Sequence, residues 1–278
     1  MHEFLNHIIL GILQGITEFL PVSSSGHLVV AQKLLGVNEP GFFVEICLHF
    51  GTLVAIIIVF RRQLLELTRD GLVGAWVTAH SLSLKKARDA APAFPTAVAI
   101  VIGTVPAACA GVLLEDTIAR IFEGNTVLTG MMLFLTGVVL LASRFARRDG
   151  SREVNGGRGF CVGIAQACAL LPGISRSGMT IVAGYFLGLE KQTAAHFAFL
   201  LAVPIMLGAV GWDTIRIMMG SAPFQVEAAE IGPLMAGSFL AAIVGWVCLK
   251  LLLKTVSKGK LYWFSAYCMP MGLILLFV

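Results

Sequence analysis

The segment that decides the fold is residues 14–27, Gln-Gly-Ile-Thr-Glu-Phe-Leu-Pro-Val-Ser-Ser-Ser-Gly-His. It places a carboxylate (Glu18), three consecutive hydroxyls and an imidazole (His27) inside a hydrophobic run. Pro21 ends any helix that enters from the N-terminal side, because its ring clashes with the preceding turn and removes a backbone donor. Ionisable groups at membrane depth are costly and mark functional sites. The segment therefore predicts a broken helix that carries chemistry.

The composition indicates that the chain is an integral membrane protein. Of its 278 residues, 57% are hydrophobic and only 13% are charged, whereas soluble domains carry about 25% charged residues. The apolar runs are continuous, unlike the alternating strands of a β-barrel. We therefore expect one all-α polytopic domain over residues 1–278. The net charge of +4 does not indicate nucleic-acid binding, because the basic residues cluster in short loops.

Six apolar runs are long enough to approach a full membrane span, which takes about 20 helical residues. They are residues 43–60, 93–114, 127–145, 193–212, 231–253 and 262–278. Two further regions, 4–36 and 159–189, each contain two short apolar pieces separated by a proline break. Such broken backbone is tolerated at depth only where protein encloses it. We therefore predict two re-entrant helical hairpins in addition to about six transmembrane helices.

The positive-inside rule orients these elements. Residues 61–92, 144–158 and 250–260 hold 15 of the 20 Lys and Arg residues. All three loops are cytoplasmic if six spans separate them in the predicted order. The first hairpin then enters from the outside and the second from the cytoplasm.

The two hairpins also resemble each other in sequence. With an offset of 152 residues, 10 of 26 positions are identical, including Gln14 with Gln166 and the Ser-x-Ser-Gly of residues 23–26 with that of 175–178. We therefore predict an inverted repeat, with one half at about 1–145 and the other at about 155–278. Repeats of this kind place a site near the bilayer midplane, where their broken helices meet.

The first hairpin offers the reactive groups. Gln14 and Glu18 are four residues apart, so they share one helix face. Pro21 ends that helix, and Ser23 or Ser24 caps the next one. Ser24 and His27, three apart, form either a serine nucleophile with a histidine base or a histidine nucleophile with a hydroxyl that orients it. Glu18 then holds the imidazole or binds a divalent cation.

The second hairpin offers an anion site. Pro172 and Gly173 end one short helix, Ser175 caps the next, and Arg176 lies in its first turn. A helix N-terminus presents free N–H groups to an anion. Arginine adds a planar fork that binds two phosphate oxygens and keeps its proton. Together the hairpins favour phosphoryl transfer, in which positioning and charge stabilisation supply most of the catalysis.

Both motifs resemble the signature motifs of the bacterial undecaprenyl-diphosphate phosphatases of the bacitracin-resistance type. The resemblance rests on residues 14–27 and on residues 172–180, Pro-Gly-Ile-Ser-Arg-Ser-Gly-Met-Thr. It implies removal of the terminal phosphate of undecaprenyl diphosphate in the bacterial inner membrane, at a site that opens to the periplasmic face. It further implies a divalent cation, Mg²⁺ or Ca²⁺. The catalytic positions of the family fall on Glu18, Ser24, His27 and Arg176.

The remaining ligand predictions follow from the same motifs. We expect the substrate phosphates to contact Ser23, Ser25, Gly173, Ser175, Ser177 and Thr180. The predicted metal ligands are Glu18 and Gln14. The family often has a glutamate where this chain has Gln14, whose amide oxygen can coordinate a cation but carries no charge. The expected partners are the polyprenyl diphosphate lipid and the membrane, and a homodimer is an open alternative.

Other readings stay open at the level of sequence. Glu18 and Arg176 could form a purely structural ion pair, and His27 could be a packed core histidine. Glu45 and His49, four apart near the start of a span, either line the cavity or make core hydrogen bonds. Inverted repeats with broken helices are also typical of transporters, so a transporter or flippase of polyprenyl phosphate or another anion is the alternative function.

Overall fold

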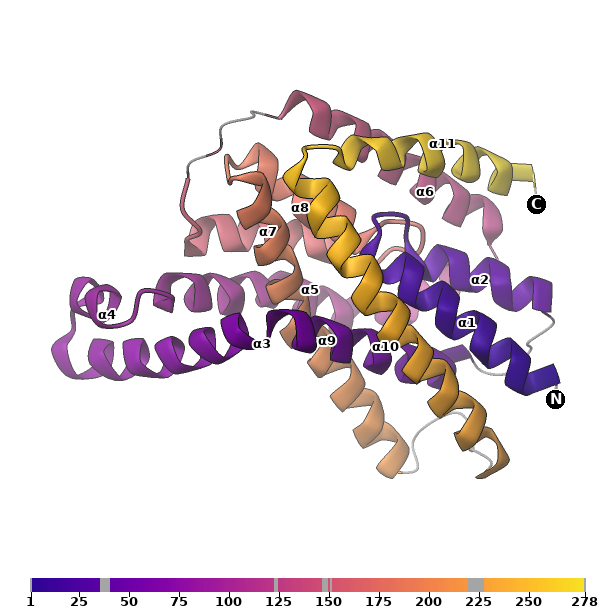
Figure 1. Cartoon of the computed structure of the whole chain (residues 1–278), viewed down its shortest axis with the longest axis horizontal. Helices are drawn as coiled ribbons and strands as arrows, with labels where there is room; N and C mark the ends of the chain where they lie inside the picture. Colours follow the sequence, from indigo (N-terminus) through magenta and orange to yellow (C-terminus); the bar gives the residue numbers. More distant parts are fainter. Residues whose placement is uncertain are drawn as a thin grey trace.

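The computed structural model describes residues 2–35, 41–122, 125–146, 150, 152–219 and 228–277. In this part of the chain all regular structure is helical (Figure 1). Five helices are long and apolar enough to cross a membrane. The chain is therefore an all-α, multi-pass membrane protein, as its composition predicts. Gly36 and Val278, the predicted ends of the first hairpin and the last span, lie outside the described residues.

The five long helices match five of the six predicted spans. They are α3 (Gly41–Ser81), α5 (Phe94–Phe122), α6 (Thr126–Ala142), α9 (Lys191–Met218) and α10 (Ala228–Ser257). The sixth predicted span is shorter and divided. It consists of η2 (Leu261–Phe264), α11 (Ser265–Ile274) and η3 (Leu275–Phe277).

Helix α3 extends well past the predicted end of its span. It continues through Arg61 and Arg62 to Ser81 as one helix of 41 residues. Arginine is a good helix former. These charges therefore mark the end of the apolar run but not the end of the helix. The short helix α4 (Leu84–Ala90) follows and lies at one extreme of the molecule (Figure 1).

Each hairpin consists of two short helices, as predicted. The first contains α1 (His2–Phe19) and α2 (Ser24–Leu35), and the second contains α7 (Gly156–Cys168) and α8 (Arg176–Phe186). The breaks fall at Pro21 and at Pro172-Gly173. In both hairpins the two arms contact each other.

Glycines allow the first helix of each hairpin, α1 or α7, to approach a long helix closely. A Cβ atom at Gly11 of α1 would overlap the backbone of Gly237 in α10, and one at Gly163 of α7 would overlap the backbone of Gly103 in α5. Small residues at such contacts are characteristic of helix packing in membranes. Gly11 and Gly163 are equivalent under the 152-residue offset, so the two hairpins use the same device.

The basic segments meet at one end of the molecule. The Arg88 guanidinium is 2.6 Å from the Glu153 carboxylate, and the Arg144 guanidinium lies 5.9 Å from the ring centre of Tyr262. Both chain termini lie at the opposite side of the view from α4 (Figure 1). These contacts bring the predicted basic segments close together.

Candidate active site

The tips of the two hairpins lie against each other in the interior. A Cβ atom at Gly178 would stand 3.3 Å from Pro21 Cβ, and one at Gly26 would stand 3.4 Å from Gly173 Cα. Gly173 has φ +97°, a conformation that glycine adopts without steric cost. The tips thus approach closely because glycine occupies the contact points on both sides.

Long helices hold the second tip in place. The Thr136 hydroxyl of α6 donates to the Gly173 carbonyl at 3.0 Å and accepts from the Ser175 backbone N–H at 3.1 Å. Thr136 is 1% exposed, so these bonds form away from water. The tip that carries Arg176 is therefore fixed to a membrane-spanning helix.

A serine cap stands at the start of the second helix of each hairpin, α2 and α8. The Gly26 N–H donates to Ser23 Oγ at 3.4 Å, and the Gly178 N–H donates to Ser175 Oγ at 3.1 Å. The hydroxyls of Ser23 and Ser25 are 3.3 Å apart. Ser23 has φ +68°, which costs a non-glycine residue about 1–3 kcal/mol and is found mainly at functional sites.

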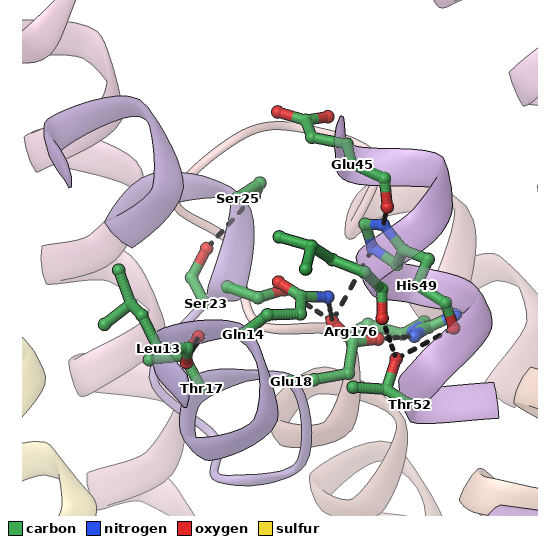
Figure 2. Close-up of polar contacts among 12 residues, drawn as sticks. Leu13, Gln14, Thr17, Glu18, Ser23, Ser25, Glu45, His49, Thr52 and Arg176 are labelled. Carbon is green, nitrogen blue, oxygen red and sulfur yellow. Dashed lines mark hydrogen bonds and ion pairs between the residues drawn. The ribbon is translucent and has the colours of Figure 1, made fainter. Parts of the chain in front are cut away.

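Glu18 is the centre of the site (Figure 2). Its Oε2 accepts from Gln14 Nε2 at 3.0 Å and from Ser24 Oγ at 2.6 Å. Its Oε1 accepts a hydrogen bond and ion pair from Arg176 Nη2. The Glu18 side chain is only 3% exposed. A buried carboxylate needs such partners, because an unpaired charge in the interior is very costly.

His27 takes partners other than Glu18 and Ser24. Its Nδ1 lies 2.7 Å from the Ser23 carbonyl and its Nε2 lies 2.6 Å from the Tyr267 hydroxyl. A carbonyl only accepts, so Nδ1 carries the hydrogen, and Nε2 accepts from Tyr267. The predicted Ser24–His27 pair is therefore not formed in this state, and Ser24 bonds to Glu18 instead.

The other predicted phosphate ligands line the site or support it. The hydroxyl oxygens of Ser177 and Ser175 are 3.2 Å apart and share a hydrogen bond. The Thr180 hydroxyl donates to the Arg176 carbonyl at 2.8 Å. A small cavity of about 10 Å³ beside Glu18 is lined by Arg176, Ser177 and Thr180. That space suits one water molecule. A diphosphate is larger than this space, so side chains of the lining have to move when it enters.

Two residues that the motifs do not include complete the site. His49 of α3 has Nε2 3.6 Å from Glu18 Oε2, and Tyr267 of α11 bonds to His27. The spacing of Glu45 and His49 along the chain indicated that His49 could line the cavity, which agrees with its contact to Glu18. No local pattern indicates Tyr267, which is 240 positions away from His27.

The donor set offers limited support for a metal ion. Within the described residues no three His, Cys, Asp or Glu side chains converge. Gln14 presents its NH₂ group to Glu18, while its Oε1 is buried without a hydrogen-bond partner. Mg²⁺ usually takes one or two carboxylates and completes its shell with water and substrate phosphates. The residues therefore fit a cation held by Glu18 and completed by the diphosphate.

Comparisons with known proteins agree with the motifs. The family model described as "Bacitracin resistance protein BacA" matches residues 7–274. A protein of Desulfosudis oleivorans named undecaprenyl-diphosphatase is 40% identical over 279 residues, covering 99% of this chain and 98% of that protein. Undecaprenyl-diphosphatase 2 of Bacillus thuringiensis is 37% identical over 276 residues, covering 99% and 97%. Undecaprenyl-diphosphatase of Christiangramia forsetii is 35% identical over 274 residues, covering 98% and 96%.

Proposed function

The chain belongs to the family of the bacitracin resistance protein BacA, and from that premise we propose that it hydrolyses undecaprenyl diphosphate to undecaprenyl phosphate and inorganic phosphate. One observation carries the proposal: the Ser24 hydroxyl donates directly to the buried Glu18 carboxylate, and Arg176 lies beside the same carboxylate. A nucleophile, a base and a phosphate-binding cation thus meet at one point. The product recycles a lipid carrier for cell-wall synthesis.

The first chemical step belongs to Ser24 and Glu18. Ser24 Oγ attacks the terminal phosphorus and its proton passes to Glu18 Oε2, 2.6 Å away. As the Oγ–P bond forms, the bridging P–O bond breaks and undecaprenyl phosphate leaves with the bond's electron pair. We assign the nucleophile to Ser24 rather than His27 because His27 Nε2 faces Tyr267.

Arg176 binds the phosphate that is transferred. In the resting site its guanidinium pairs with Glu18. It lies in the first turn of α8, where the free N–H groups of the helix favour an anion. When the diphosphate arrives, the guanidinium turns to the phosphate oxygens. Glu18 then loses a charge partner and becomes a better proton acceptor for Ser24.

The second step returns the serine to its starting state. A water molecule attacks the phosphorus, the Oγ–P bond breaks, and Glu18 gives its proton back to Ser24. His27 Nε2, the ring nitrogen without a hydrogen because Nδ1 donates to the Ser23 carbonyl, takes one proton of the water and passes it to the departing phosphate. Tyr267 has to release that nitrogen first. A bound Mg²⁺ or Ca²⁺ ion supplies charge neutralisation for the diphosphate.

The proposed setting is the bacterial inner membrane, with the site reached from the periplasmic face. The meeting of the basic segments at one end supports the orientation, because cytoplasmic loops carry the excess of Lys and Arg. The equivalent glycine contacts of Gly11 and Gly163, and the equivalent caps of Ser23 and Ser175, support the proposed inverted repeat.

The test is phosphate release from C55 isoprenyl diphosphate by the purified protein in detergent. We expect Ser24→Ala to abolish release, while Ser257→Ala, which changes an exposed serine at the end of α10 that bonds to the Lys254 carbonyl, keeps it. A radiolabelled terminal phosphate should also remain on the wild-type protein after a rapid acid quench, but not on Ser24→Ala. If the folded wild type binds the lipid and releases no phosphate, transport becomes the better reading.

A further inference from the structure

We propose that Thr136 of α6 is a positioning residue for Arg176, and that it acts by holding the backbone of the second hairpin tip. The inference deepens the proposed function, on which it rests, because it names what aims the phosphate-binding guanidinium. Thr136 lies in an apolar stretch of α6 outside both motifs. It takes no part in the proposed bond changes, so its effect on the reaction passes through Arg176.

The Thr136 hydroxyl is directed away from its own helix. Threonine hydroxyls inside helices commonly bond to a carbonyl of the preceding turn. Thr129 of the same helix does so, with its hydroxyl 3.1 Å from the Asn125 carbonyl. The Thr136 hydroxyl instead donates to the Gly173 carbonyl at 3.0 Å and accepts from the Ser175 N–H at 3.1 Å. Both of its bonds therefore serve the second tip.

These two bonds hold the backbone that leads directly into Arg176. They join positions 173 and 175 across the turn, and Arg176 follows as the first residue of α8. Gly173 has φ +97°, so the turn has a shape that few residue types adopt without strain. Thr136 is 1% exposed, so water does not replace its hydroxyl. Loss of the hydroxyl would leave a buried carbonyl and a buried N–H without this partner.

A fixed backbone matters because Arg176 has to change partners. Its guanidinium pairs with Glu18 in the resting site and turns to the diphosphate in the proposed first step. A side chain that turns about a fixed Cα atom brings its planar fork to a defined place. Rates depend steeply on such placement, since a displacement of about 1 Å can cost about 10²-fold. Thr136 therefore sets where the fork meets the phosphate.

The first tip is held by α11, the helix that packs against α6. The Cys268 thiol donates to the Pro21 carbonyl at 3.4 Å, and a thiol is a weak donor. Helices α6 and α11 approach closely at this level, because a Cβ atom at Gly137 would overlap the Met269 side chain. One pair of packed helices thus holds both tips, and Thr136 supplies the stronger of the two polar contacts.

The test measures phosphate release from C55 isoprenyl diphosphate by full-length variants in detergent. Thr136→Val keeps the branched shape but loses the hydroxyl, and we expect its kcat to fall about 10- to 100-fold. Thr136→Ala is a second variant without the hydroxyl and has the same expected result. Thr136→Ser keeps the hydroxyl and should recover most of the activity. The control is Thr104→Val, which removes a hydroxyl that bonds to the Ile100 carbonyl of its own helix and should keep the activity.

A double-mutant cycle separates positioning of Arg176 from a general effect on stability. If Thr136 acts through the guanidinium fork, Thr136→Val should change the activity of Arg176→Lys by less than about twofold, because the fork is already absent there. A purely structural role would instead lower the melting temperature and leave unchanged the kcat of the folded protein, measured well below that temperature.

Equal kcat values for the wild type and the folded variants without the hydroxyl would overturn the inference. Additive losses in Thr136→Val and Arg176→Lys, or no recovery in Thr136→Ser, would overturn it as well. In each of these cases the wild type still releases phosphate, so the proposed function stands. If the wild type releases none, the proposed function fails and this inference fails with it.

Discussion

At the scale of single residues, the site depends on how one buried carboxylate is compensated. Glu18 accepts from Gln14, Ser24 and Arg176, and none of these partners can leave without a replacement. Removing one partner of a buried pair costs about 3–5 kcal/mol, because the other charge stays uncompensated. The diphosphate replaces Glu18 as the partner of Arg176, and the proton that Ser24 gives to Glu18 neutralises the carboxylate. Binding of the substrate therefore also frees Glu18 from Arg176, so that Glu18 can act as the base.

Arg176→Lys tests this exchange. Lysine keeps the positive charge near Glu18, so the variant should fold, but it lacks the planar fork that binds two phosphate oxygens. We expect kcat to fall by about 10²–10³-fold with little change in thermal stability. Steady-state phosphate release from C55 isoprenyl diphosphate measures it, with Arg158→Lys at the basic end as the control. Near-normal turnover in Arg176→Lys would mean that the fork does not hold the transferred phosphate.

The sequence predicted the parts of the site that the two hairpins supply, left the role of His49 open and missed Tyr267. Glu18 and Ser24 lie on either side of the same proline break, and Arg176 occupies the matching place in the other hairpin, so a repeat brings them together. Tyr267 and His49 reach the site from α11 and α3. Contacts between distant helices depend on packing, which leaves no period in the sequence.

At the scale of helices, proline and glycine decide where the chain breaks and where it packs. The prolines at 21 and 172 allowed both hairpins to be predicted. The length of α3 could not be predicted from hydropathy, because arginine ends an apolar run without ending a helix. The last predicted span is divided because 3₁₀ turns flank α11.

Close helix packing gives a prediction about stability. A Cβ atom at Gly163 would meet the backbone of Gly103, which cannot rotate away, whereas a Cβ atom at Gly111 would meet nothing within 4 Å. We expect Gly163→Ala to destabilise the protein by about 1–3 kcal/mol. Gly111→Ala should be neutral or stabilise it by up to about 1 kcal/mol. Thermal unfolding in one detergent compares them, and equal melting temperatures would contradict the close contact.

At the scale of the whole molecule, the arrangement brings the tips of two short hairpins together, and long helices pack against both hairpins. Each hairpin alone leaves polar groups in an apolar setting. Their meeting pairs the carboxylate of one with the guanidinium of the other, so assembly of the fold and assembly of the site are the same process. The inverted repeat was predicted from ten identities, and it stays a prediction that the equivalent glycine contacts support.

The orientation of the molecule yields a last prediction. Lys86 in α4 and Lys258 after α10 belong to the basic segments, whereas Arg120 lies in the last turn of α5. In a cysteine-free background, Lys86→Cys and Lys258→Cys should react with a membrane-impermeant maleimide only after the cells are opened. Arg120→Cys should react in intact spheroplasts, because α5 crosses the bilayer between Lys86 and Arg120. Labelling of Arg120→Cys and Lys86→Cys from the same side would mean that α5 does not cross. Labelling of Arg120→Cys in intact spheroplasts would support entry of the first hairpin from the periplasm and access of the diphosphate headgroup to Ser24 from that face.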